Sequence, residues 1–460
     1  MSSGKQPYPM KAPVTTITLN PEHVIGKMKP MHCVNNGPVK GTISNFSYFR
    51  AAGIPYVRNH DASHYGGYGG PHVVDVNLIF RDMSRNPDDE SAYDFHLTDE
   101  LVANTMSAGS KVFYRLGASI EHWSKKYNTL PPADYAKWAE VCAKIIEHYN
   151  HGWNGGFQHG IEYWEIWNEP DLRENQPADC RPTWGGTAQE FFDLYRVVAT
   201  LLKERFPEIK VGGPATCTPN LDWVSRFLTD MTKDGKRVPL DFFSWHRYTS
   251  DPRAISKFAA EMRQALDRFG YTDAESILNE YNYIRDWIGE DYIYSFQTIS
   301  NEKGAAFTAA CFAAGQNSPL DMLMYYDARP NTPFNGMFDF ITKRPIKGYY
   351  PFLYYSQLYQ MGQQIQCDGE DSDIFALAAK DAETGRTSLM LAYYTDDDEA
   401  KPKNLHINLD KYREYDCRIV DASRMDCPFF PTWCRYIKDW SENHLEFTLS
   451  PQSVLFLKEI

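Results

Sequence analysis

The stretch Trp164-Glu165-Ile166-Trp167-Asn168-Glu169-Pro170 decides the fold of this protein. Its first half consists largely of bulky apolar residues, as in a strand that is buried on both faces. The run then ends in an Asn-Glu pair directly before a proline. Polar residues at the end of a buried strand are typical of a parallel β/α barrel, in which the carboxyl ends of the strands point into the binding mouth.

Short β-prone runs alternate with longer helical patterns between about residue 22 and residue 361. We expect the following eight strands: His23–Cys33, Pro55–Arg58, Lys111–Arg115, Ile161–Trp167, Ile209–Gly213, Asp241–His246, Ser276–Glu280 and Asp321–Tyr326. Eight strand-helix units with right-handed crossovers predict an α/β fold, a (β/α)8 TIM barrel. The competing fold, an open doubly wound sheet, is disfavoured because no G-x-G-x-x-G turn follows the first strand.

Helix-end signals support this pattern. Thr187 and Glu190 form a capping-box pattern before apolar residues that line one helical face. A similar amphipathic segment covers Ala133–Tyr149. A third, Ala254–Phe269, stops at Gly270, and glycine suits the left-handed backbone that often ends a helix.

The sequence changes character after about residue 363. Short strand-like runs are separated there by turn-rich or charged segments, which predicts a small β-sandwich. We therefore expect a barrel over residues 21–362 and an accessory β-sandwich domain over residues 363–460. A strand from residues 1–20 could join the sandwich.

Composition and charge disfavour several classes of partner. The net charge of −13 argues against nucleic acid and anionic membranes, because phosphate attraction needs a basic face. Apolar runs are too short for a membrane span, and the first thirty residues lack the apolar core of a secretory signal. The 9 cysteines show no C-x-x-C pair or zinc-type spacing, so we expect reduced thiols and a cytoplasmic location. Self-association into a homo-oligomer stays open.

Two of the expected strand ends carry a glutamate. Glu169 closes the fourth strand and Glu280 closes the seventh, which places them across the barrel mouth from each other. Two carboxyl groups about 5 Å apart cleave a glycosidic bond with retention of configuration. Either glutamate alone could instead cap a helix or bind an arginine, whereas the pair on strands four and seven indicates catalysis.

An ordered set of motifs resembles glycoside hydrolase family 39 of clan A, the family of β-xylosidases and α-L-iduronidases. The matching segments are Tyr56–His60, Leu130–Tyr135, Glu165–Leu172, Val211–Ala215, Val238–Tyr248 and Asn279–Asn282. The resemblance implies a retaining hydrolase with Glu280 as the nucleophile and Glu169 as the general acid/base. It also implies a C-terminal β-sandwich and a reaction that needs neither a cofactor nor a metal.

The resemblance further assigns residues to the sugar pocket. Asn168 would hydrogen-bond the 2-hydroxyl of the sugar, or would serve only as a turn residue before proline. His60, His246 and Tyr248 would line the pocket and orient the nucleophile, although a lone strand-end histidine is often structural. Tyr281 would hold Glu280 or merely pack. The Glu280 anion should raise the pKa of Glu169 by like-charge repulsion until the sugar esterifies Glu280.

Three positions depart from the family pattern. Tyr326 occupies the place of a tryptophan stacking platform, Asn279 replaces the usual threonine before the nucleophile, and Arg115 replaces an apolar or acidic pocket residue. Arg115, Arg247 and Arg329 could therefore contact a carboxylated sugar, although pairing with Asp or Glu is the commoner role of arginine. The resemblance therefore predicts the mechanism more directly than it predicts the sugar.

The leading hypothesis is an exo-acting, β-xylosidase-like hydrolase that removes a terminal sugar from an oligosaccharide or glycoside by double displacement. One alternative keeps this mechanism and changes the sugar to an arabinose-, galactose- or uronic-acid-containing glycoside. Another alternative is a barrel that binds carbohydrate without cleaving it, which the presence of both glutamates disfavours. An open groove rather than a deep pocket would indicate an endo-acting enzyme.

Overall fold

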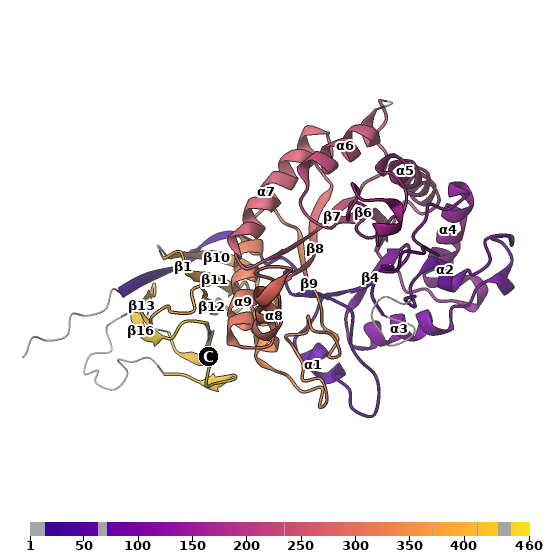
Figure 1. Ribbon diagram of the computed structural model, residues 1–460. Coiled ribbons are helices and arrows are strands. Elements are labelled where there is room, and N and C mark those ends of the chain that lie inside the picture. Colours follow the sequence, from indigo (N-terminus) through magenta and orange to yellow (C-terminus); the bar gives the residue numbers. More distant parts are fainter. Residues whose placement is uncertain (1–13, 63–70, 234, 370, 412, 431–442) are drawn as a thin grey trace, which may run out of the picture. The chain divides into compact units, whose positions relative to one another are not determined.

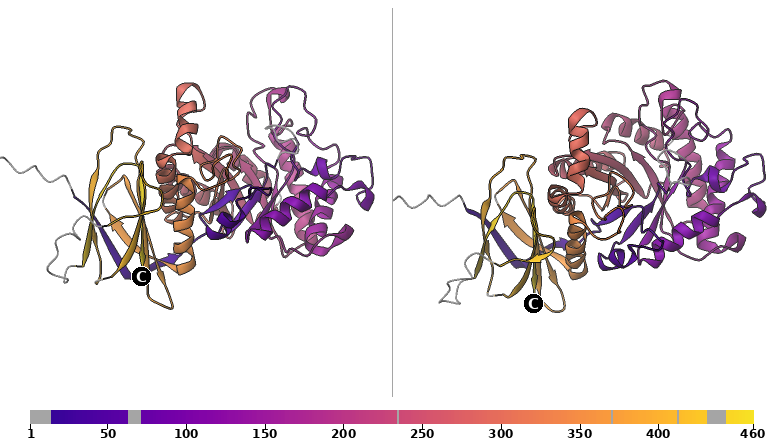
Figure 2. Two further views of the ribbon diagram at one scale, coloured as in Figure 1. Left: turned by 90° about the horizontal axis from the view of Figure 1, so that it is seen from below. Right: turned by 60° about the horizontal axis from the view of Figure 1, so that its bottom comes forward.

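The computed structural model describes residues 14–62, 71–233, 235–369, 371–411, 413–430 and 443–460. Contacts divide the chain into two compact units (Figures 1 and 2). The barrel unit comprises Lys29–Ile299 and Ala314–Pro345. The sheet unit comprises Met1–Met28, Ser300–Ala313 and Ile346–Ile460. None of the helices in the described ranges is long and apolar enough to cross a membrane.

Eight parallel strands close into a barrel, which confirms the predicted fold class (Figure 1). The strands are β2 (Cys33–Asn35), β3 (Tyr56–Asn59), β4 (Lys111–Leu116), β5 (Tyr163–Ile166), β6 (Lys210–Thr216), β7 (Phe242–Thr249), β8 (Glu275–Tyr283) and β9 (Met322–Tyr325). Each strand pairs with the next, and β9 pairs with β2 to complete the ring.

Helices and short 3-10 turns connect the strands. The helices are α1 (Phe46–Ala51), α2 (Val76–Ile79), α3 (His96–Ser107), α4 (Tyr135–His151), α5 (Ala188–Arg205), α6 (Leu221–Thr232), α7 (Arg253–Arg268), α8 (Gly289–Ile299), α9 (Glu302–Gln316) and α10 (Tyr350–Met361). The 3-10 turns are η1 (Glu90–Ala92), η2 (Trp153–Gly155), η3 (Ala178–Cys180) and η4 (Lys347–Tyr349). The predicted capping box is confirmed, since Thr187 and Glu190 exchange both of its hydrogen bonds at the start of α5. Gly270 follows α7 with a φ of 78°.

The barrel interior changes from apolar to polar along the strands. An apolar layer is formed by Cys33, Phe113, Tyr163, Phe242, Ile277, Met322 and Met324. Alternate residues of a strand face the same side, so the next inward positions lie two residues further on. On five of these strands they are Asn35, Arg115, Glu165, Ser244 and Asn279, all buried. A polar layer therefore lies between the apolar core and the strand ends.

The first barrel strand differs from the prediction. The sequence predicts it over residues 23–33, but β1 (Val14–Lys27) carries residues 23–27 into the sheet unit, where Lys27 pairs with Gln363. The barrel strand β2 begins only at Cys33. The prediction was wrong because antiparallel pairing with β10 extends β1 to Lys27.

The sheet unit holds one continuous nine-stranded sheet in the order β15-β14-β17-β12-β11-β10-β1-β13-β16. Its further strands are β10 (Gly362–Gly369), β11 (Ile374–Asp381), β12 (Thr387–Tyr393), β13 (Lys403–Asn408), β14 (Tyr415–Val420), β15 (Cys427–Pro428), β16 (His444–Leu449) and β17 (Ser453–Glu459). The sheet is curled (Figure 2). Ile419 of β14 and Phe447 of β16 come from strands near its two ends, and both belong to one hydrophobic core. β1 lies between β10 and β13 in this sheet. The expected boundary at residue 362 coincides with the junction of α10 and β10, whereas the sheet unit already begins at Ile346 and also includes Ser300–Ala313.

Candidate active site

A sharp turn after β5 positions Glu169. The backbone φ angles of Trp167 and Glu169 are 76° and 50°. Residues other than glycine rarely adopt such positive values. The Glu169 amide donates to the carbonyl of Ala215, 2.8 Å away, and this bond ties the turn to β6. Uncommon backbone conformations of this kind gather at functional sites, where the surrounding structure holds them.

A β-bulge in β8 positions Glu280. The β7–β8 pairing matches Trp245 with Leu278 and His246 with Glu280, so Asn279 is the extra residue. An extra residue interrupts the alternation of side chains, so two consecutive ones can face the same side. Asn279 Nδ2 donates to Glu165 Oε1 at 2.6 Å, while Glu280 Oε1 accepts from Arg58.

The two glutamates lie close together. One oxygen of Glu169, one oxygen of Glu280 and one ring nitrogen of His246 lie within 4.8 Å of one another. His246 Nδ1 is 2.9 Å from Glu169 Oε1 and 3.5 Å from Glu280 Oε2. An inverting glycosidase separates its carboxyl groups by about 6.5–9.5 Å to admit a water, whereas a retaining one brings them to about 5 Å. The spacing here suits retention.

Arg58 connects the proposed nucleophile with the polar layer. It is completely buried and donates to Glu280 Oε1 at 2.6 Å, to Glu165 Oε2 at 2.7 Å and to Asn168 Oδ1 at 2.7 Å. The Tyr248 hydroxyl donates to Glu280 Oε2 at 2.8 Å. Both oxygens of Glu280 therefore accept a hydrogen bond, which favours its carboxylate form. Glu169, His246 and Glu280 could together ligate a cation, but the Arg58 guanidinium already supplies a positive charge beside Glu280.

Burial raises the pKa of both glutamates. Burial raises the pKa of Glu169 to about 7, with an opposing effect of Arg58 and a smaller rise from Asp61. The pKa of Glu280 is raised as well, mainly by burial, and the charge of Arg58 and the hydrogen bond from the Tyr248 hydroxyl oppose this rise. The sequence led us to expect that repulsion by Glu280 controls the pKa of Glu169; the largest cause is burial instead. Burial lowers the pKa of His246 to about 4, so this imidazole is neutral at pH 7.

His60 and Arg115 lie on the side of the site formed by β3 and β4. His60 Nε2 is 3.5 Å from Glu280 Oε1, and Arg115 Nε donates to His60 Nδ1 at 3.2 Å. Arg115 is fully buried and pairs with Asp75 at 2.6 Å. Arg115 thus supports His60, and its charge is balanced within the protein.

Tyr326 and Arg329 meet at the buried carboxylate of Asp61, a residue outside the predicted sugar pocket. The Tyr326 hydroxyl and the Arg329 guanidinium both donate to Asp61. His72 Nε2 is 2.7 Å from the other oxygen of Asp61, and Asp327 also pairs with Arg329. Asp61 therefore fixes Tyr326 and balances the charge of Arg329.

Tyr281 and Arg247 point away from the carboxylates. Neighbouring residues of a strand face opposite sides, so Tyr281 faces away from Glu280, and its buried ring packs against Tyr325 at 5.7 Å. The guanidinium of Arg247 lies over the ring of Phe258, 4.9 Å from its centre.

Sequence reasoning missed Arg58, Glu165 and Asp61. The sequence contains a pattern that could have identified Arg58. Arg58 lies two residues before His60, so the two side chains face the same side of the strand. An arginine facing a barrel interior needs a buried carboxylate as its partner. Which carboxylate that is depends on barrel closure, because Glu280 lies 222 residues further along the chain.

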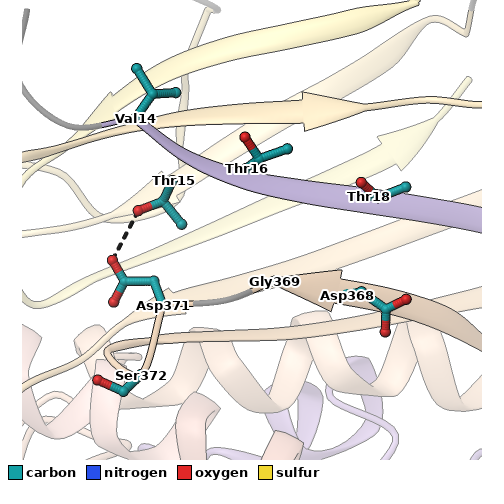
Figure 3. Close-up of a pocket in the computed structure, with 8 residues that line it drawn as sticks. All are labelled: Val14, Thr15, Thr16, Thr18, Asp368, Gly369, Asp371 and Ser372. Atoms are coloured by element: carbon teal, nitrogen blue, oxygen red, sulfur yellow. Dashed lines mark hydrogen bonds between the residues drawn. The ribbon is translucent and has the colours of Figure 1, made fainter.

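A separate cavity of the sheet unit contains none of the predicted site residues. It is lined by Val14, Thr15, Thr16, Thr18, Asp368, Gly369, Asp371 and Ser372 (Figure 3). Thr15 donates to Asp371 there at 2.9 Å, and Lys403 also pairs with Asp371. The carboxylate of Asp371 is therefore already paired within the sheet unit.

Comparisons with known proteins show the family and the fold. The model of the family described as glycosyl hydrolases family 39 matches residues 46–289, a range that includes Glu169 and Glu280. A β-xylosidase of Geobacillus stearothermophilus is 30% identical over 213 residues, 43% of this chain and 37% of that protein. A β-xylosidase of Caldicellulosiruptor saccharolyticus is 30% identical over 187 residues, 38% of this chain and 35% of that protein. The chain thus spans little more than a third of the length of these relatives.

Solved structures share the complete architecture. A glucosidase from Croceicoccus marinus has a TM-score of 0.77 at 20% identity and covers 98% of this chain and 99% of its own. A monomeric β-xylosidase from Caulobacter crescentus CB15 has a TM-score of 0.67 at 16% identity and covers 96% and 99%. These likenesses show the fold. Because the family model matches more than half of the residues, the chain belongs to glycosyl hydrolases family 39.

Proposed function

We propose that this protein is a retaining, exo-acting, β-xylosidase-like glycosidase. The observation that carries the proposal is the approach of Glu169 and Glu280 within 4.8 Å around His246. Arg58 and Tyr248 favour the anion at Glu280, and burial raises the pKa of Glu169 to about 7. One carboxylate and one carboxylic acid are the groups that double displacement requires. The two β-xylosidases, each 30% identical over about two fifths of this chain, support the same sugar.

In the first step a Glu280 oxygen attacks the anomeric carbon while Glu169 gives its proton to the departing oxygen. The glycosidic bond breaks, and an ester forms between Glu280 and the sugar. In the second step Glu169, now ionised, takes a proton from water as that water attacks the anomeric carbon. Glu280 leaves as a carboxylate, and Glu169 regains its proton. Asn168, whose Oδ1 is fixed by Arg58, would present its amide to the 2-hydroxyl.

The charges around the site support a neutral sugar. Arg115 pairs with Asp75, and Arg329 pairs with Asp61 and Asp327, so neither guanidinium is left to balance a sugar carboxylate. This arrangement disfavours the uronic alternative and leaves xylose, arabinose and galactose to be separated by a screen. His60, Tyr326 and the neutral His246 provide polar groups for sugar hydroxyls.

The remaining proposals concern partners and compartment. The net charge of −13 favours a neutral glycoside over nucleic acid or an anionic membrane as the partner. Free thiols such as the buried Cys33 and Cys142 support a reducing compartment, the cytoplasm.

Trapping of the covalent intermediate tests the mechanism. The chain is incubated with a 2-deoxy-2-fluoro-β-xyloside that carries an activated leaving group, and its peptides are analysed by mass spectrometry. We expect one fluoroxylosyl group on Glu280 and none in the Glu280→Gln variant; the matched surface variant Glu446→Gln should still be labelled at Glu280. NMR during turnover of an aryl β-xyloside should show the β-anomer first. An α-anomer as the first product would overturn the retaining mechanism.

A further inference from the structure

A row of aromatic rings leads from the proposed nucleophile to exposed surface. The ring of Tyr248, whose hydroxyl binds Glu280, lies 5.2 Å from Trp287 and 5.9 Å from Phe334. Trp287 and Phe334 are 6.4 Å apart, and Tyr326 lies 5.3 Å from Phe334. We call Tyr248, Trp287, Phe334 and Tyr326 the aromatic row. All four belong to the barrel unit.

Trp287 forms the exposed end of this row. It is 51% exposed, and its neighbour Ile288 is 74% exposed. Ile293, on the first turns of α8, is 56% exposed. These residues lie on the segment after β8 and on α8. In a barrel the segments that follow the strands surround the active-site mouth. Grouped exposed apolar side chains commonly mark a surface that a ligand covers.

The chemistry of this surface suits the leaving group better than the sugar. Sugar hydroxyls need polar partners, and those partners, Asn168 and His60, lie deeper beside Glu280. The indole of Trp287 and the side chain of Ile288 offer a flat ring and aliphatic carbon instead. Asp286 and Glu290, which flank them in the sequence, disfavour an anionic group.

We propose that Trp287 stacks on an apolar, uncharged aglycone and so gives the enzyme a preference for aryl or alkyl glycosides over oligosaccharides. This inference rests on the proposed function and names its substrate class. Trp287 is then a specificity-determining residue: it contacts the leaving group, while its ring packs on Tyr248. Loss of an aromatic stacking contact of this size weakens binding about tenfold.

Two thioglycosides that resist hydrolysis test the proposal by binding alone. Phenyl and methyl 1-thio-β-D-xylopyranoside share the sugar and differ only in the aglycone. Calorimetric titration of the wild-type chain should show tighter binding of the phenyl compound. In Trp287→Ala the Kd of the phenyl compound should rise about tenfold and that of the methyl compound should change less than twofold. Trp287→Phe should restore most of the phenyl preference.

Phe430→Ala serves as the matched control, because Phe430 is 76% exposed and belongs to the sheet unit. It should leave both Kd values unchanged. Equal weakening of both ligands in Trp287→Ala would place Trp287 against the sugar and overturn the proposal. Equal binding of both ligands by the wild type would overturn it as well. A failure of the proposed function would be recognised by a different measurement. In that case the wild type would hydrolyse no aryl glycoside, regardless of how the two thioglycosides bind.

Discussion

Nη1 of Arg58 lies 2.6 Å from Oε1 of Glu280, and both side chains are almost completely removed from solvent. The same guanidinium pairs with Glu165, whose second oxygen accepts from Ser244 and Asn279. The attraction within such a buried group offsets the cost of taking its charges out of water only while every partner is present. Arg58 thus links the nucleophile to the interior of the barrel.

Replacement of Arg58 should reduce both activity and stability. Arg58→Lys retains a positive charge but loses the planar fork that reaches Glu280, Glu165 and Asn168 together, so kcat/KM should fall about 100-fold or more. Arg58→Ala leaves two buried carboxylates without their cation, and the free energy of unfolding should fall by about 3–5 kcal/mol. Aryl-xyloside kinetics and urea unfolding measure the two effects. Arg226→Lys, at a half-exposed ion pair, is the control, and equal losses there would contradict the prediction.

Glu169 should determine the alkaline side of the pH profile. Its pKa is raised to about 7, and the first step needs it protonated. The value of kcat/KM should therefore fall tenfold per pH unit once the pH rises above about 7. Glu169→Gln should lack this decline and should lose most activity on alkyl glycosides, whose leaving groups need the proton. An unchanged alkaline decline in Glu169→Gln, measured from pH 5 to 9, would assign the decline to another group.

The hydroxyl of Tyr248 should lower the pKa of Glu280. In Tyr248→Phe the hydrogen bond of 2.8 Å to Glu280 Oε2 is lost. Since that bond favours the carboxylate, the acidic side of the profile should move to higher pH, and kcat/KM should fall about 10- to 100-fold. Tyr281→Phe is the control, because Tyr281 follows Glu280 directly in β8 and its ring faces away from that carboxylate. A loss in Tyr281→Phe as large as that in Tyr248→Phe would contradict the assignment.

Buried His32 should make stability depend on pH. Burial lowers its pKa from 6.5 to about 3, so between these values the unfolded chain binds a proton that the folded chain does not. The free energy of unfolding should therefore decrease as the pH falls below 6.5, by about 1.4 kcal/mol per pH unit from this residue. The free energy of unfolding, measured with urea between pH 4 and 6.5, should depend less steeply on pH for His32→Gln than for the wild type. His151→Gln, at a half-exposed ring, should keep the wild-type slope; an equal slope in all three would exclude His32 as its source.

Local patterns in the sequence were sufficient for the barrel and for its two glutamates. Strand alternation, the capping box at Thr187 and polar residues at strand ends all depend on neighbours within a few positions, so they can be recognised without coordinates. The bounds of the first strand could not be predicted in this way, because β1 gains its length from pairing with β10, more than 300 residues away.

The sequence by itself therefore determined the fold class and indicated Glu169 and Glu280 as candidates, since both predictions follow from periodicity and from position at the end of a strand. Only the tertiary structure decided which charges meet: Arg58 with Glu280 and Glu165, Arg115 with Asp75, and Arg329 with Asp61. It also decided which side chains face the site, because the bulge at Asn279 turns Glu280 inward and leaves Tyr281 outside. The physical reason is that pairing and burial depend on distances across a closed barrel, and these distances join residues that are far apart in the chain.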